Sequence, residues 1–169
     1  MLRGINVGGH NMVKMDALKA LHESLGLKNV RTYLQSGNVV FQARSADPLR
    51  IEREIQETLQ LDLTVILRSA AELRAAVSAN PLPQRVHHPS AYVIAFLSAE
   101  PRDPSALDAY AGPEERRLLG RELYLYYGEG MARSKLTNAL IERKLGVKAT
   151  ARNWRTVTKL LELCEPLEP

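Results

Sequence analysis

Apolar residues in the first half of the chain recur at spacings that alternate between those of strands and those of helices. The run "LRGINV" at 2–7 is predicted to be a short strand, and the leucines within 14–26 follow at near-helical spacing. Two β-rich runs within 29–42 then precede a helix over 47–60 and a strand over 63–69. This order, β-α-β-β-α-β, is the ferredoxin-like pattern.

Turn and cap signals mark the ends of these elements. Gln35-Ser36-Gly37-Asn38 separates the two β-rich runs, and glycine and asparagine tolerate the positive φ of a tight hairpin. Asp47 and Pro48 stand at the N-cap and the first position of the next helix. The sequence therefore predicts a hairpin followed by a capped helix.

The second half of the chain partly repeats this order. Ser69-x-x-Glu72 is a capping-box signature that predicts a third helix, ending before Pro81. The elements predicted after it are a strand over 91–98, a helix starting within 103–112, a hairpin about Gly120-Arg121, and helices over 134–146 and 151–164. The predicted fold is α+β, with a ferredoxin-like N-terminal half packed with a related βαββ half that ends in C-terminal helices.

Residues 81–90 contain three prolines and two histidines, which makes this stretch the candidate linker between the halves. The sequence thus predicts a ferredoxin-like α/β subdomain over 1–80 and a proline-rich linker over 81–90. A second α/β subdomain with C-terminal helices is predicted over 91–169.

Length and composition are typical of a globular protein. The 169 residues are 45% hydrophobic and 25% charged, enough to bury a core without a disulfide or metal. Cys164 is the only cysteine, which excludes an internal disulfide and a cysteine-based zinc site. No apolar stretch approaches 18 residues and no signal peptide is apparent, so we expect a cytoplasmic protein without a membrane partner.

Positive charge is concentrated near the C-terminal end. Residues 131–160 contain eight basic residues against Glu142 alone, a net charge of +7, which leaves −3 for the rest of a chain whose net charge is +4. Such a segment attracts phosphates or acidic surfaces, although a solvated helical face has the same composition.

Three stretches carry a family resemblance: "LRGINVGG" at 2–9, "VRTYLQSGNVVF" at 30–41 and "SKLTNALIERKLGVKATARNWRTVTKL" at 134–160. The chain resembles the family catalogued as domain of unknown function 1697, widespread in bacteria, over essentially its whole length. The resemblance implies a small cytoplasmic α+β protein with no established activity. Relatives usually carry more apolar residues before this start, which implies that the chain begins inside the first strand, and they commonly carry lysine where this chain has His10.

One candidate site follows from the predicted topology. The first two strands of a βαββαβ unit are parallel, so the end of the first and the turn after the second lie at one edge of the sheet. The first helix starts there too, and its free N–H groups suit a phosphate or carboxylate. Two ordinary polar loops would look the same, and "GINVGG" is neither GxGxxG nor a P-loop. The candidate ligand-binding residues at this edge are Asn6, Gly8, Gly9, His10, Asn11, Lys14, Gln35, Ser36 and Asn38.

A second candidate lies before and within the C-terminal helices. Two glycines within 128–135 precede basic residues where a helix is predicted to begin, with Ser134 as its N-cap. Cations are unfavourable in a first helical turn, and a bound anion would offset that. Trp154 is predicted to be a core residue because it falls on one helical stripe with Val157 and Leu161, whereas a base-stacking surface would need it exposed beside the arginines. The candidate ligand-binding residues here are Arg133, Lys135, Arg152 and Asn153.

Known catalytic motifs are absent from the sequence, and we expect neither a metal nor a cofactor. Three functions stay open. The leading hypothesis is a binding module for a phosphorylated or otherwise anionic ligand, nucleic acid included. The first alternative is a small enzyme acting on a phosphorylated metabolite, in which Lys14 and Arg133 bind the anion and His10 or a carboxylate transfers protons. The second alternative is a structural or interaction protein without a small ligand.

Overall fold

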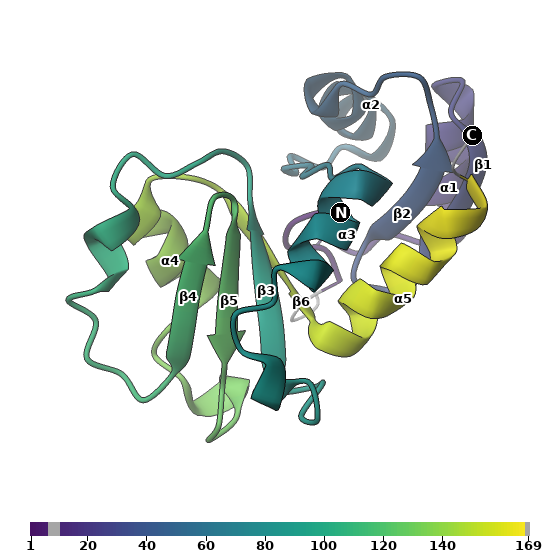
Figure 1. Cartoon of the computed structure of the whole chain (residues 1–169). Helices are drawn as coiled ribbons and strands as arrows, with labels where there is room; N and C mark the ends of the chain where they lie inside the picture. The colour runs from purple at the N-terminus through teal and green to yellow at the C-terminus, as the bar shows by residue number, and fades with distance from the viewer. Residues whose placement is uncertain (7–10, 168–169) are drawn as a thin grey trace. The chain divides into compact units, whose positions relative to one another are not determined.

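The computed structural model describes residues 1–6 and 11–167, and it divides the chain into two compact units (Figure 1). Unit 1 comprises Met1–Ala70 and Leu160–Pro169, and unit 2 comprises Ala71–Lys159. The fold is α+β, with two antiparallel sheets and five α-helices in the described residues. No helix in that part of the chain is long and apolar enough to cross a membrane.

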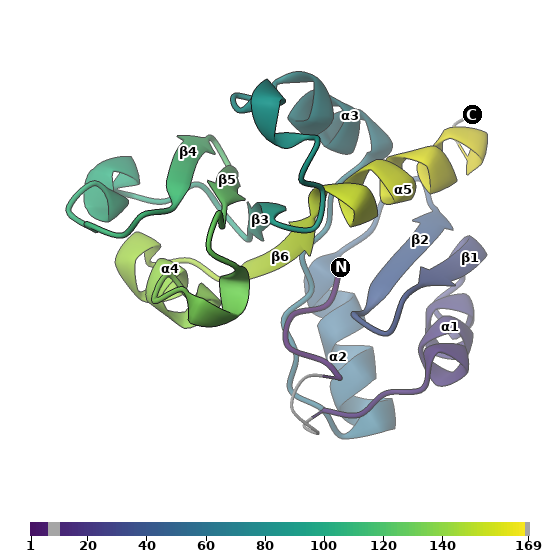
Figure 2. The ribbon, with the colours of Figure 1, turned by 90° about the horizontal axis from the view of Figure 1, so that it is seen from below.

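Unit 1 is built on a hairpin and two helices. The hairpin consists of β1 (Lys28–Tyr33) and β2 (Asn38–Gln42), and the helices are α1 (Met15–Ser24) and α2 (Pro48–Leu59). Both helices lie on the same side of the hairpin (Figure 2) and form an apolar core with it. These elements confirm the predicted hairpin and the two predicted helices.

The cap of α2 is the one that the sequence predicts. Pro48 is the first residue of the helix, and Asp47 Oδ1 accepts a hydrogen bond from the Leu49 backbone N–H at 2.9 Å. This contact satisfies one of the N–H groups that the first turn leaves without a helical partner.

The strands predicted over 2–7 and 63–69 are replaced by a single antiparallel bridge between Leu2 and Val65. Two further backbone bonds flank it, from Arg3 N–H to Thr64 O at 3.0 Å and from Ile66 N–H to Met1 O at 2.9 Å. Extended pairing then stops because the residues at 4 and 6 have positive φ, +71° and +52°. The complete ferredoxin-like sheet predicted for this half is therefore not observed among the described residues.

Unit 2 contains a four-stranded antiparallel sheet in the order β4-β5-β3-β6. Its strands are β3 (Tyr92–Leu97), β4 (Glu115–Leu119), β5 (Glu122–Tyr126) and β6 (Ala149–Asn153). The β4–β5 hairpin turns at Gly120 and Arg121, as predicted, with Leu119 opposite Glu122. The helices α3 (Ala70–Ser78) and α4 (Asn138–Leu145) lie on opposite sides of the sheet (Figure 2), and α5 (Trp154–Cys164) follows β6.

Two predictions for this half are wrong in type. The helix expected within 103–112 is only a 3₁₀ turn, Pro104–Leu107, because backbone bonds such as Asp108 N–H to Ser105 O at 2.8 Å join residues three apart. The segment before α5 forms strand β6, where no strand was predicted, and the helix begins at Trp154. Pairing with β3 decides this, since "ATARN" has no strong strand pattern of its own.

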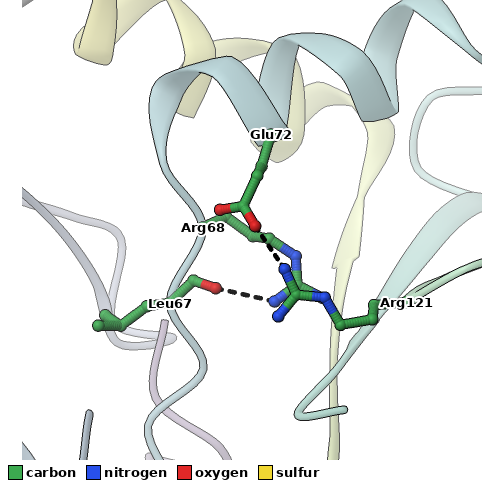
Figure 3. A network of polar contacts seen from close by, with 4 residues as sticks. All are labelled: Leu67, Arg68, Glu72 and Arg121. Carbon is green, nitrogen blue, oxygen red and sulfur yellow. Dashed lines mark hydrogen bonds and ion pairs between the residues drawn. The ribbon is translucent and has the colours of Figure 1, made fainter. Parts of the chain in front are cut away.

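Helix α3 is tied to the β4–β5 turn by an ion pair between Glu72 and Arg121 (Figure 3). Both side chains are partly exposed, so the pair contributes about 1 kcal/mol or less. The neighbouring Arg68 donates to the carbonyl oxygen of Leu67 at 2.8 Å. The buried side chains of α3, Leu73 and Ala76, therefore matter more for its stability than this ion pair does.

Gly37→Ala tests how closely the hairpin turn approaches the N-terminal segment. Gly37 has φ +75°, and an added Cβ would lie 2.6 Å from Ile5 Cδ1 and 2.9 Å from Leu2 Cβ. We expect a loss of about 1–2 kcal/mol from the left-handed backbone and about 1–3 kcal/mol more from overpacking, measured by urea unfolding.

Gly26→Ala is the matched control. Gly26 has a similar φ of +81°, with nothing within 4 Å of an added Cβ, so this variant should show only the backbone loss. Equal losses in the two variants would show that the contact with Leu2 and Ile5 has no energetic weight.

Candidate functional site

The polar edge of unit 1 brings together segments that are distant in sequence. Asn6 Nδ2 donates to Gln35 O at 2.7 Å and to Val13 O at 3.1 Å, and Asn6 Oδ1 accepts from Val13 N–H at 2.8 Å. One asparagine side chain therefore links the start of the chain, the approach to α1 and the hairpin turn.

The other amides of this edge also bond within the fold. Asn11 Nδ2 donates to Gly4 O at 3.1 Å. Asn38 is fully buried, and its Nδ2 donates to Tyr33 O at 2.9 Å and Ser36 Oγ at 3.0 Å. These amide contacts make the asparagines structural links within unit 1.

Four further candidates of this edge lie between positions 8 and 14 of the sequence. Lys14 is exposed at the N-cap of α1, whereas Gly8, Gly9 and His10 lie outside the described residues.

The two predicted groups of site residues fall in different units. Within unit 2, Arg133 and Lys135 line the same cavity, but Arg152 and Asn153 do not.

Arg152 is buried on β6, where its guanidinium donates to Thr150 Oγ1 and Ala151 O, both at 2.8 Å. Burial lowers the pKa of Arg152 to about 10. Asn153 Oδ1 accepts from Thr156 N–H at 2.9 Å, which makes it a cap of α5.

The cavity of unit 2 has a volume of about 590 Å³ and is formed by three segments. Residues 110–114 lead into β4, residues 127–130 leave β5, and residues 133–135 precede α4. The segment 131–133 is a 3₁₀ turn, and α4 begins only at Asn138 with Thr137 as its cap. The N-cap role predicted for Ser134 is therefore wrong.

Ser134 instead joins two walls of the cavity. Its hydroxyl donates to Glu114 Oε1 and accepts a hydrogen bond from Leu136 N–H at 2.9 Å. Glu114 is only 7% exposed, and its second carboxylate oxygen, Oε2, is buried without a hydrogen-bond partner among the described residues. A buried carboxylate of the loop 110–114 thus contacts the segment that carries the two basic residues.

Burial would raise the pKa of Glu114, but the groups around its carboxylate outweigh that effect. The hydrogen bond from the Ser134 hydroxyl and the nearby backbone N–H, Tyr110 hydroxyl and Arg116 charge favour the ionised form, so the pKa of Glu114 lies below its usual value. Glu114 is therefore ionised at neutral pH.

The cavity lining also contains two tyrosines, Tyr110 and Tyr127. The Tyr127 hydroxyl donates to Leu136 O at 3.0 Å, and burial together with the charge of Glu114 raises its pKa to about 12. Burial and the bond to Glu114 likewise raise the pKa of Tyr110. Both phenols stay protonated at neutral pH.

Sequence reasoning identified Arg133 and Lys135 but missed Glu114. "GPEERR" presents two adjacent glutamates, and nothing in it shows that the first is buried while the second pairs with Arg85. Only the register of the β4–β5 hairpin separates their environments, because Glu115 lies opposite Tyr126 inside the ladder.

A family model described as "Protein of unknown function (DUF1697)" matches residues 1–124, so the chain belongs to this family. Among solved structures it is similar to one described as "The structure of conserved bacterial protein SP0830 from Streptococcus pneumoniae". The two share 18% sequence identity with a TM-score of 0.70, over 97% of this chain and 95% of that one. At this identity the likeness shows the fold alone. No curated protein matches the chain.

Asn6→Ala tests the structural role of the polar edge. The variant loses three hydrogen bonds, two of them partly buried, and we expect it to unfold at lower urea concentration than the wild type. Asn11→Ala is the control because its φ of +49° is close to the +52° of Asn6, while its side chain makes one exposed bond. The loss should exceed that of the control by about 1–3 kcal/mol, and an equal loss would contradict this role.

Ser134→Ala tests the origin of the Glu114 pKa. The variant removes the strongest hydrogen bond to the carboxylate and leaves burial in place, so the pKa of Glu114 should rise, as measured by carbonyl-region NMR titration. A depressed folded-state pKa stabilises the protein above the unfolded pKa, and this contribution is lost as pH falls through the folded value. The variant should therefore lose its Glu114-dependent stability at a higher pH than the wild type; an unchanged pKa would rule out Ser134 as the cause.

Proposed function

We propose that this protein is a binding module for a small ligand with a phosphate or another anionic group, and that the cavity of unit 2 is the binding site. Arg133 and Lys135 carry the proposal. Both are exposed at the cavity, and within the described part of the chain neither forms an ion pair or a side-chain hydrogen bond. Two unpaired cations beside a concave site are what an anionic ligand requires.

The size of the cavity supports a small ligand. Its volume of about 590 Å³ lies within the roughly 300–1,000 Å³ that is usual for small-molecule sites. Glycines at 128 and 130 lie in one wall, where the lack of side chains lets a phosphate approach the backbone N–H of Gly128, whereas the N–H of Gly130 already donates to Tyr127 O at 3.0 Å.

Binding fits the site better than catalysis. Glu114 is the carboxylate that could activate the Ser134 hydroxyl, but its pKa is lowered, and a general base works best with a pKa near the operating pH. The contact between them instead fixes the geometry of the cavity walls. This favours a binding module over an enzyme that uses Ser134 as a nucleophile.

A small ligand also fits better than nucleic acid. Arg152, part of the basic segment 131–160, is buried. Trp154 is half-buried and stacks on Tyr92, with ring centroids 5.1 Å apart. One cation and one aromatic ring that could have met a nucleic-acid strand are therefore used inside unit 2.

The double variant Arg133→Ala, Lys135→Ala tests the proposal. Titration of the wild type with inorganic phosphate at low salt should shift the amide NMR signals of Gly128 and Gly130, and the variant should bind at least about 10-fold more weakly because both charge-assisted contacts are lost.

Arg143→Ala, Lys144→Ala is the matched control, since it removes two exposed cations from the last turn of α4, outside the cavity lining. Equal weakening in both variants would assign phosphate binding to general surface charge. Binding of single-stranded oligonucleotides with log affinity falling steeply against log salt, insensitive to the first variant, would favour nucleic acid instead.

A further inference from the structure

We infer that the ligand of this cavity carries an ammonium or similar N–H donor in addition to its anionic group, and that Glu114 binds that donor. The inference rests on the proposed function and specifies the chemical class of its ligand. It makes the ligand amphoteric, with a cation and an anion in one small molecule.

The first argument is the state of the Glu114 carboxylate. Oε1 accepts from Ser134, whereas Oε2 is buried and has no hydrogen-bond partner in the described part of the chain. Folded proteins leave few buried polar atoms in this state, because a buried acceptor without a donor is destabilising. A ligand donor would satisfy Oε2.

The second argument is the way in which Arg116 is used. This guanidinium lowers the pKa of Glu114, but its hydrogen bonds go to backbone carbonyls: Tyr110 O at 2.6 Å, Asp108 O at 3.4 Å and Glu114 O at 3.5 Å. The carboxylate therefore has a cation nearby and no N–H from it. A charged N–H donor from a ligand would balance the negative charge of the Glu114 carboxylate and donate the hydrogen bond that Arg116 does not.

The third argument is the spacing of opposite charges. Ser134, whose hydroxyl contacts Glu114, is flanked in the chain by Arg133 and Lys135. The carboxylate and the two cations therefore stand on adjoining walls of the cavity, and all three residues line it. A ligand that meets both has its ammonium and phosphate groups a few bonds apart, as in an aminoalkyl phosphate.

Tyr110 is the side chain that we expect to give way to the ligand. Oε2 is shielded from solvent, so a donor reaches it only if part of the loop 110–114 moves. Tyr110 is half-buried, belongs to that loop, and its hydroxyl acts on the Glu114 carboxylate.

The test compares two probes that differ only in the ammonium group, 2-aminoethyl phosphate and ethyl phosphate, by calorimetric or NMR titration of the full chain. The wild type should bind 2-aminoethyl phosphate about 10-fold or more tightly, the usual effect of one charge-assisted hydrogen bond. Glu114→Gln should abolish this preference while still binding ethyl phosphate. Glu129→Gln, which removes an exposed carboxylate of the same cavity, should keep it.

The outcomes separate the two levels of the proposal. Equal wild-type affinity for the two probes overturns the role of Glu114 and leaves the anion site intact. Binding of neither probe overturns the proposed anion site itself. A preference that persists in Glu114→Gln or disappears in Glu129→Gln assigns the ammonium to another group and rejects the inference. If Glu114→Gln fails to fold, equal wild-type affinities for the two probes still overturn the inference, and loss of the preference in Glu129→Gln still rejects it.

Discussion

Strand β3 has to bury all six of its side chains while both of its edges are hydrogen-bonded to neighbouring strands. Alternate residues meet this constraint on opposite faces, with Val93, Ala95 and Leu97 packed on the α4 side. On the other face, Tyr124 of the neighbouring strand donates to Ala76 O of α3 at 2.7 Å. A slip of one residue would exchange the two faces, so the register of unit 2 is firmly set.

The position of the cavity follows from this register. Tyr92 lies opposite Tyr126, and the ladder continues for one bond beyond it, from Tyr127 N–H to Ala91 O at 3.0 Å. Glu115 lies opposite Tyr126 on the other side, which places Glu114 beside Tyr127 at the end of the hairpin. The carboxylate is therefore held by the sheet, and Ser134 and Arg116 then stabilise its ionised form.

The polar edge of unit 1 uses the side chains of its asparagines within the fold. Asn6, Asn11 and Asn38 all direct amide groups to backbone carbonyls, because irregular segments leave carbonyl and N–H groups without a regular ladder. Two of these residues, Asn6 and Asn11, also adopt the positive φ that asparagine tolerates. Composition alone does not reveal this structural use, whereas the hydrogen-bond partners do.

The sequence by itself determined the elements whose signals are local: the β1–β2 and β4–β5 hairpins, the Asp47-Pro48 start of α2, and the α+β class. Turn residues and caps act through near neighbours, so their pattern is sufficient. It also identified Arg133 and Lys135 as candidate anion-binding cations near a glycine-containing loop. These features need no knowledge of distant contacts.

Tertiary structure alone decided the features that depend on distant partners. Strand β6 forms because it pairs with the edge of β3. The strand expected at 2–7 is reduced to one bridge, because the backbone after it adopts positive φ. Burial of Glu114 and of Arg152 depends on which neighbours the sheet register supplies. A charged side chain has the same letter in the sequence whether it is solvated or enclosed, and only packing determines which of the two it is.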